Sequence, residues 1–208
     1  MRGLLLLLAL ALTAGCASTG TNTPQTQSEP SPAPAPSGQP CTETPTSYGW
    51  GWDCLVKSGI TPKMRAATQQ PLCKKQIDPE RFWVGLARSI AYGESYEWRK
   101  GRKYYGKVDP TSTYTESFVD SLTGKLAESV GLFQLSVGDK LRYRGMCTAL
   151  TSGALRDPMV NVGCAIIIMD TLTGTRSDLQ TSLGRYWSTV RPGGRAIARL
   201  KIELPECF

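Results

Sequence analysis

The sequence predicts an α+β fold that is predominantly α-helical and contains one small β-hairpin. Three patterns predict it: an apolar stripe of helical spacing after Asp78, a charge-free segment after Asp157, and two short strand-like runs between Ser117 and Ala127. The chain has 208 residues, of which 40% are hydrophobic, so it is long enough to bury a core. We expect one folded domain, at residues 46–208, preceded by two other segments.

Residues 1–15 have the features of an export signal peptide. Arg2 is followed by an apolar run from Leu4 to Leu12, and small residues come next. This run is much shorter than the roughly 20 apolar residues that a membrane-spanning helix needs. We therefore expect export and removal of the segment.

Thr13-Ala14-Gly15 directly before Cys16 resembles the lipobox of bacterial lipoproteins. The resemblance implies lipidation of Cys16, and Ala17 after it resembles the sorting pattern of outer-membrane lipoproteins. We expect an envelope lipoprotein that faces the periplasm and contacts the membrane through its lipid. A secreted protein with an incidental cysteine is the alternative.

Residues 16–45 predict a lipidated cysteine followed by a tether rich in proline, serine and threonine. Seven of the chain's 14 prolines occur there, and the only charged residues are Glu29 and Glu43. Such a composition buries too little apolar surface to offset the entropy of ordering. Residues 46–208 have 23 basic and 15 acidic residues, a charge of +8 that indicates either a solvated basic face or an anionic polymer partner.

The chain contains no histidine, which excludes Ser-His-Asp and Cys-His nucleophiles and H-E-x-x-H zinc sites. We expect no metal and no cofactor, because the cysteines lack C-x-x-C spacing and no glycine-rich nucleotide motif occurs. The six cysteines after Cys16 favour disulfides in an oxidising compartment. We favour pairing of Cys147 with Cys164 across a short loop; the pairing of the others stays open: Cys41, Cys54, Cys73 and Cys207.

The first helix is predicted to begin at Asp78-Pro79-Glu80, where an N-cap acceptor precedes proline and an acid. From there Phe82, Leu86 and Ile90 recur every four residues, and the next step reaches Glu94. A carboxyl partly removed from water has a raised pKa and acts as an acid at neutral pH. The alternative is that the helix ends at Gly93 and leaves Glu94 in solvent.

A second helix is predicted after Asp157-Pro158, where residues 159–169 carry no charge and indicate burial on all sides, as in a central helix. Residues 117–119 and 126–127 flank a turn-rich stretch and predict the hairpin. Two later helices are expected at 177–190 and 195–202, separated by Pro192-Gly193-Gly194.

Three sequence motifs occur one after another along the chain. Glu94-Ser95 closes the first apolar helix, a Ser-x-Gly-Leu-Phe-Gln-Leu block spans residues 129–135, and Asp157-Pro158-Met159-Val160-Asn161 opens the second helix. Together they resemble the soluble lytic transglycosylases, which have a lysozyme-like fold. The resemblance covers residues 82–188, about half of the chain.

The resemblance implies that Glu94 protonates the oxygen between N-acetylmuramic acid and N-acetylglucosamine in peptidoglycan and then acts as a base. In lytic enzymes the sugar's own C6 hydroxyl closes an anhydro ring, so one carboxylate suffices. Here the interval from Glu94 to Gly131 is longer than in that family, and it contains Glu116 and Asp120 beside the hairpin. A lysozyme-type hydrolase with Glu116 as second carboxylate is therefore the alternative.

The resemblance also places Ser129, Gly131 and Gln134 in the wall of a substrate cleft. Gly131 would let the backbone approach the sugar, and Ser129 and Gln134 would offer hydrogen bonds. Asn161 is expected to satisfy buried backbone groups rather than to touch substrate.

A second departure from the family lies near residue 186. Arg185-Tyr186-Trp187-Ser188 stands where the family has Ala-Tyr-Asn-x-Gly. We expect Tyr186 to orient the acid and Trp187 to stack on a sugar ring; packing of both rings in the core is the alternative.

The expected partner is therefore the glycan strand of peptidoglycan, bound by a monomer. A non-catalytic envelope lipoprotein that only binds peptidoglycan is the rival class. Nucleic acid is a poor partner for an exported, lipidated chain.

Overall fold

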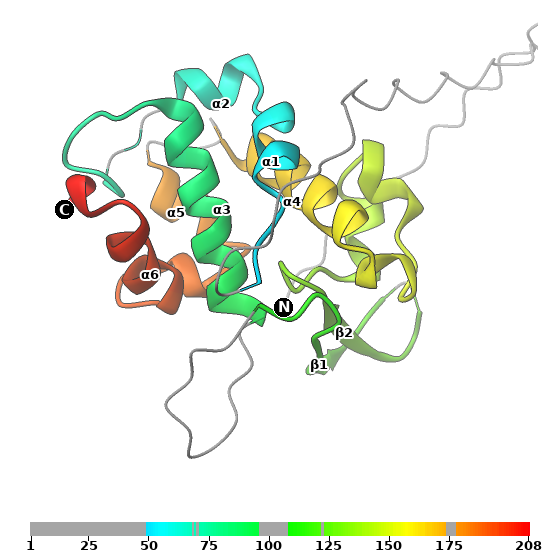
Figure 1. Ribbon diagram of the computed structural model, residues 1–208. Helices are drawn as coiled ribbons and strands as arrows, with labels where there is room; N and C mark the ends of the chain where they lie inside the picture. Colours follow the sequence, from blue (N-terminus) through cyan, green and yellow to red (C-terminus); the bar gives the residue numbers. More distant parts are fainter. Residues whose placement is uncertain (1–48, 68, 70, 96–107, 122, 174–177) are drawn as a thin grey trace, which may run out of the picture. The chain divides into compact units, whose positions relative to one another are not determined.

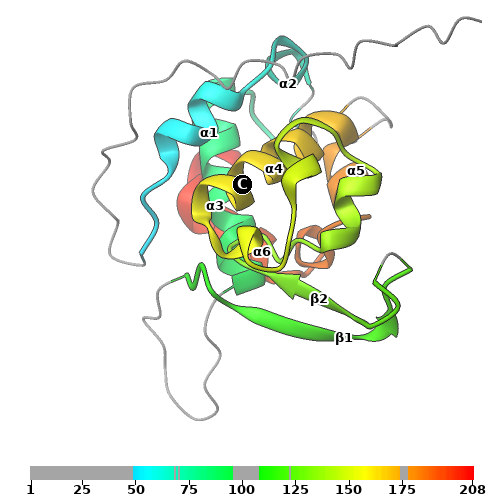
Figure 2. The ribbon, with the colours of Figure 1, turned by 90° about the vertical axis from the view of Figure 1, so that its right-hand side faces the viewer.

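The computed structural model describes residues 49–67, 69, 71–95, 108–121, 123–173 and 178–208. The predicted signal peptide, the lipidation site Cys16 and the tether lie outside the described residues. Helices surround the central helix α4, and a two-stranded antiparallel sheet lies at one edge of them (Figures 1 and 2). None of the helices in these ranges has the length and apolar content to span a membrane.

Two short helices, α1 (Asp53–Gly59) and α2 (Pro62–Ala66), precede the first predicted helix and were not predicted, although Thr61 and Pro62 form an N-cap and a first helical residue for α2. Trp50, just before α1, is fully buried. The indole of Trp83 donates a hydrogen bond of 2.9 Å to the carbonyl of Met64 in α2. This N-terminal region is therefore part of the core.

Helix α3 (Pro79–Ser95) begins and runs as the sequence predicts. The Asp78 carboxylate accepts a hydrogen bond of 2.8 Å from the amide of Arg81, and the apolar stripe is buried. The helix continues through Gly93 to Ser95, so it does not fray before Glu94. Its outer face is held by Arg88, which bonds Asp53 of α1 and Glu203 of α6 (Arg195–Glu203).

The predicted hairpin is present as β1 (Thr113–Val119) and β2 (Leu126–Val130). The strands pair antiparallel, with Tyr114 opposite Ser129 and Thr115 opposite Glu128. The register shifts between Thr115 and Val119, so β1 is irregular there. The sheet therefore presents Tyr114 and Ser129 on one face and Thr115 and Glu128 on the other.

Helix α4 (Pro158–Leu172) is the buried central helix that its charge-free sequence predicts. The Asp157 carboxylate caps it by accepting a hydrogen bond of 2.9 Å from the amide of Met159. The fully buried Asn161 donates to the carbonyls of Val130 and Leu155 and accepts from the amide of Phe133. Asn161 therefore satisfies buried backbone groups, as expected.

Between β2 and α4 the chain forms three short 3-10 helices: η1 (Val137–Leu141), η2 (Gly145–Ala149) and η3 (Ala154–Arg156). The predicted disulfide Cys147–Cys164 is confirmed and ties η2 to α4. A second disulfide joins Cys73 to Cys207, which are 134 residues apart, and Cys54 is also disulfide-bonded.

The expected helix over 177–190 is wrong in extent. Only α5 (Leu179–Leu183) and the 3-10 helix η4 (Ser188–Val190) form there. Between them Trp187 takes an extended backbone conformation, which lets its indole donate a hydrogen bond of 3.0 Å to the carbonyl of Phe133 in the core. Helix α6 forms as predicted, and η5 (Pro205–Cys207) ends the chain.

Candidate active site

The carboxylate of Glu94 lies at the C-terminal end of α3, one residue before the helix ends. The residue on each side of it is buried, whereas Glu94 itself is half-buried. Gly93 allows this packing: a Cβ there would lie 3.0 Å from the side chain of Thr189 and 3.1 Å from the amide of Ala196. The lack of a side chain at Gly93 therefore brings the end of α3 against η4 and the start of α6.

Thr189 is the direct partner of Glu94 in the described part of the chain. Its hydroxyl donates a hydrogen bond to Oε1 of Glu94, and the residue is buried. Gly194 leaves room for the Thr189 backbone, since a Cβ on Gly194 would lie 2.1 Å from the Thr189 carbonyl oxygen. Sequence reasoning missed Thr189, because a threonine 95 residues from the acid carries no local signal.

Burial raises the pKa of Glu94, and the hydrogen bond from the Thr189 hydroxyl opposes that rise. The positive charge of Arg195 also lowers the pKa of Glu94, whereas the negative charge of Glu116 raises it. Because burial is the largest of these effects, the net result is a carboxyl that keeps its proton to higher pH than a solvated glutamate. A proton donor of this kind is what acid catalysis near neutral pH requires.

Glu116 comes from the middle of β1 and is the half-buried residue of an otherwise exposed strand. Its Oε1 accepts a hydrogen bond of 2.5 Å from the hydroxyl of Ser129 on β2. Its charge acts on Glu94, so the two carboxylates lie within electrostatic range of each other. The structure therefore brings together Glu94, Glu116 and Ser129, three residues that the sequence singles out.

Asp120, the other carboxylate near the hairpin, is fixed by hydrogen bonds from neighbouring residues. It is 8% exposed and accepts hydrogen bonds from the amide of Thr123 (3.1 Å) and the hydroxyl of Ser136 (3.3 Å). These bonds give Asp120 a structural role, which leaves Glu116 as the better second carboxylate.

Tyr186 donates its hydroxyl hydrogen bond to Asp139 of η1, not to Glu94. Asp139 is 5% exposed, and burial raises its pKa, while the hydrogen bond from Tyr186 opposes the rise. Burial and the charge of Asp139 raise the pKa of Tyr186 well above its usual value, and Glu94 adds a smaller effect of the same sign. Tyr186 thus lies near the acid but is oriented by Asp139, which sequence reasoning did not single out.

Gly131 and Gln134 lie in the tight turn that follows β2. Gly131 has φ +80°, and a Cβ on it would lie 2.3 Å from the Asn161 amide nitrogen and 2.5 Å from the Leu155 carbonyl oxygen. The side-chain amide of Gln134 donates to the carbonyls of Gly131 (2.8 Å) and Ser112 (3.2 Å). Packing and turn geometry account for both residues here, so the backbone of Gly131 faces Asn161 instead of an open cleft.

Trp187 is 1% exposed and packs against Phe133 and Tyr186. The structure therefore shows Trp187 as a core residue. A ring without exposed surface offers no face on which a sugar can stack. In the described residues, no group of three Cys, Asp or Glu side chains is arranged to hold a metal ion.

No protein-family model matches the sequence, and no curated protein sequence gives a significant match. Solved structures of DslA (Bd0314) from Bdellovibrio share the fold. A wild-type form is 20% identical with a TM-score of 0.58, and the match covers 80% of this chain and 98% of that chain. Two DslA mutants, each with a glutamate replaced by glutamine, are also 20% identical, with TM-scores of 0.57 and 0.55.

The two mutant structures cover 78% and 77% of this chain, and 94% and 92% of their own chains are matched. The likeness thus extends over nearly the whole of the solved DslA chains. At this identity it establishes the fold, a predominantly helical α+β architecture with one small sheet, and it confirms the fold class that the sequence predicts.

Proposed function

We propose that this chain cleaves the β-1,4 bond between N-acetylmuramic acid and N-acetylglucosamine in peptidoglycan, with Glu94 as the general acid. The observation that carries the proposal is the half-buried carboxyl of Glu94, whose pKa burial raises, at the end of an apolar helix. A binding protein has no need for a carboxyl held in this way, because burial of an ionisable group costs stability.

In the first step, the proton of Glu94 passes to the glycosidic oxygen as the bond between that oxygen and C1 of N-acetylmuramic acid breaks. The bonding electron pair leaves with the oxygen, and C1 acquires oxocarbenium character. The carboxylate left on Glu94 accepts the hydrogen bond from Thr189 and feels the positive charge of Arg195. Both interactions stabilise the ionised form that proton transfer produces.

The second carboxylate supports a hydrolytic second step. Glu116 lies within electrostatic range of Glu94 and is held by the hydroxyl of Ser129. Glycoside hydrolases use a second carboxylate in this setting, either to activate water or to form a glycosyl intermediate that water then opens. In both routes water adds to C1 and the product carries a reducing end.

The design of the test follows the solved DslA structures. Two of them have a glutamate replaced by glutamine, at a different position in each. The experiment in this chain replaces Glu94 and Glu116 in turn.

Lytic transglycosylation is the second candidate, favoured by the motif set around Glu94, residues 129–135 and Asn161. In that reaction Glu94 acts first as acid and then as base toward the C6 hydroxyl of the same sugar. The product then carries a 1,6-anhydro end and no water is consumed.

We also propose that the enzyme works in the cell envelope, as a monomer anchored through a lipid on Cys16 or as a secreted protein. The disulfides Cys73–Cys207 and Cys147–Cys164 suit an oxidising compartment.

The test combines Glu94→Gln with mass spectrometry of the soluble fragments released from purified sacculi. We expect the variant to lose fragment release while it keeps its circular dichroism spectrum and its binding to sacculi. Glu128→Gln is the control, since Glu128 is an exposed carboxylate of the hairpin that carries Glu116 and lies on the opposite face from Ser129. Undiminished release by Glu94→Gln would refute the assignment.

The wild-type products distinguish the candidates. Reducing ends indicate a lysozyme-type hydrolase, and anhydro ends indicate a lytic transglycosylase. Binding to sacculi without any product indicates a peptidoglycan-binding lipoprotein and contradicts the enzymatic proposal.

A further inference from the structure

All charged residues between Lys140 and Arg156 are basic. These 17 residues contain four cationic side chains and no aspartate or glutamate. Three of the four cations fall within five residues, at Lys140, Arg142 and Arg144. We call residues 140–156 the basic segment; it spans the end of η1, then η2 and η3.

The cations of the basic segment form no ion pair with any residue that the structure describes. Elsewhere, Arg81 pairs with Glu206 at 2.7 Å, and Arg88 and Arg199 both bond Glu203. The carboxylates next to the segment are already engaged: Asp139 is buried and bonded by Tyr186, and Asp157 caps α4. Arg142, Arg144 and Arg156 are exposed to solvent. The charge of Arg142 also acts on Asp139, and Arg156 donates a hydrogen bond of 3.4 Å to the uncharged carbonyl of Ser152.

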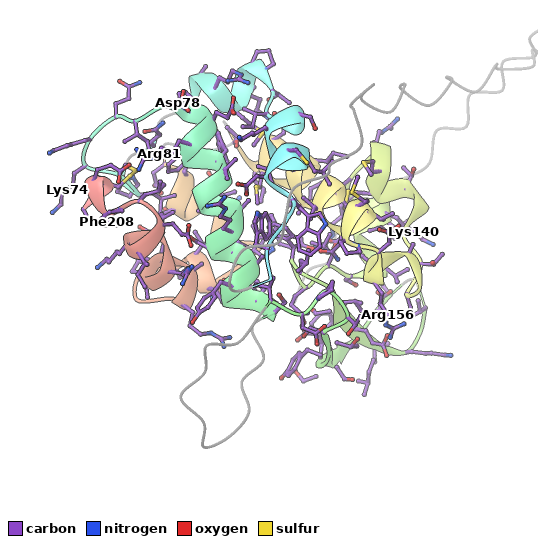
Figure 3. All side chains as sticks on the ribbon, in the orientation of Figure 1. Lys74, Asp78, Arg81, Lys140, Arg156 and Phe208 are labelled. Atoms are coloured by element: carbon purple, nitrogen blue, oxygen red, sulfur yellow. A yellow bond between two sulfur atoms is a disulfide. The ribbon has the colours of Figure 1, made fainter. Side chains whose placement is uncertain are left out.

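The basic segment begins beside residues that lie near Glu94. It starts directly after Asp139, which accepts the hydrogen bond from Tyr186, and the charge of Glu94 acts on Tyr186. The disulfide Cys147–Cys164 fixes its middle to α4. Figure 3 shows Lys140 and Arg156 on the side of the described domain away from Lys74 and Phe208.

We propose that the basic segment binds the carboxylates of the peptide stems that N-acetylmuramic acid carries in peptidoglycan. The proposal rests on the proposed function, because it assigns the substrate as the peptide-bearing strand rather than as the bare glycan. In an intact strand the lactyl carboxyl of N-acetylmuramic acid forms the amide bond to the stem, so the carboxylates of the strand lie on the stems. Arginine matches carboxylates with a planar fork of donors, and two of the three clustered cations are arginines.

Proximity favours the stem carboxylates over other anions. A strand bound at Glu94 and Glu116 brings its own stems past the surface beside the site, so their carboxylates arrive already concentrated there. The surface cations act mainly through long-range attraction, which salt weakens.

The test compares intact sacculi with glycan strands from which an amidase has removed the stems, which leaves only the lactyl carboxylate close to each N-acetylmuramic acid ring. In the variant with Lys140, Arg142 and Arg144 all replaced by glutamine, we expect the ratio of activity on intact strands to activity on stem-free strands to fall about tenfold. We also expect weaker binding to sacculi and a shallower dependence of that binding on salt. The matched control replaces Arg65, Lys75 and Lys201 by glutamine, which removes the same charge from exposed sites elsewhere.

An unchanged activity ratio would overturn the proposal, as would an equal fall in the control variant. Binding to vesicles rich in phosphatidylglycerol that depends on these three cations, with no effect on sacculi, would instead identify an anionic membrane as the ligand and also overturn it. The result for Glu94→Gln is separate: if that variant stays active, the proposed function fails, whereas the sacculus-binding assay still tests the basic segment.

Discussion

The hydroxyl of Thr189 donates a hydrogen bond to the carboxylate of Glu94, across 95 residues of sequence. The bond joins the end of α3 to the 3-10 helix before α6. Two small residues make it possible, since side chains at Gly93 and Gly194 would collide with Thr189. A contact that only the folded chain forms therefore lowers the pKa of the proposed acid against the larger effect of burial.

Replacement of Thr189 by valine should shift the high-pH limb of the activity profile to higher pH. The hydroxyl stabilises the ionised carboxylate and lowers the pKa of Glu94, so its loss raises that pKa. A general acid must be protonated, and activity then falls only at a higher pH than in the wild type. The measurement is fragment release from sacculi as a function of pH.

Thr189→Ser is the control, because serine keeps the hydroxyl and should keep the wild-type limb. A limb that stays in place or moves to lower pH in Thr189→Val would contradict a role for this bond in the protonation of Glu94.

Replacement of Glu116 by glutamine should shift the same limb in the opposite direction. The negative charge of Glu116 raises the pKa of Glu94, and glutamine removes that charge. Glu94 then loses its proton at lower pH, so the limb moves down. If the second step is hydrolytic, turnover also falls, by about 10² or more. The pH profile of the residual activity, measured beside Glu128→Gln, separates these two effects.

Replacement of Gly93 by alanine should reduce fragment release strongly and lower the free energy of unfolding only moderately. The new Cβ would lie 3.0 Å from Thr189 and 3.1 Å from the Ala196 amide, so η4 has to move away from Glu94. We expect a loss of about 1–3 kcal/mol in the free energy of unfolding, typical of an overpacked site. Urea unfolding and fragment release are the measurements.

Gly153→Ala is the matched control for this change. Gly153 has α-helical backbone angles, and the nearest atom to a new Cβ there is the Thr151 hydroxyl oxygen, at 3.9 Å. Gly93→Ala with full activity would show that the packing of α3 against η4 does not position Glu94.

Replacement of Asn161 by alanine should destabilise the protein by about 3 kcal/mol or more. Its side chain makes three buried hydrogen bonds of 2.9 to 3.0 Å, and alanine leaves the groups at Val130, Phe133 and Leu155 without these bonds. Thr151→Ala removes an exposed hydroxyl that accepts a hydrogen bond from the Ala154 amide, and it should lower the free energy of unfolding by about 1 kcal/mol at most. Urea denaturation compares the two, and equal losses would contradict the role of Asn161.

The sequence by itself determined the elements whose signals are local. The cap at Asp78 and the four-residue repeat of Phe82, Leu86 and Ile90 predict α3 and leave Glu94 at its end. The hairpin, α4 and α6 follow in the same way, because caps, turns and periodicity act between residues that are close along the chain.

Tertiary structure alone decided what surrounds the acid. Thr189 reaches Glu94, and Asp139 takes the hydroxyl of Tyr186, through contacts between distant segments. Packing also decides the role of Trp187. Its buried indole donates a hydrogen bond to the Phe133 carbonyl, so this aromatic residue belongs to the core and does not contact a sugar. A hydrogen bond between distant residues depends on how the elements pack, and no periodic pattern in the sequence encodes that packing.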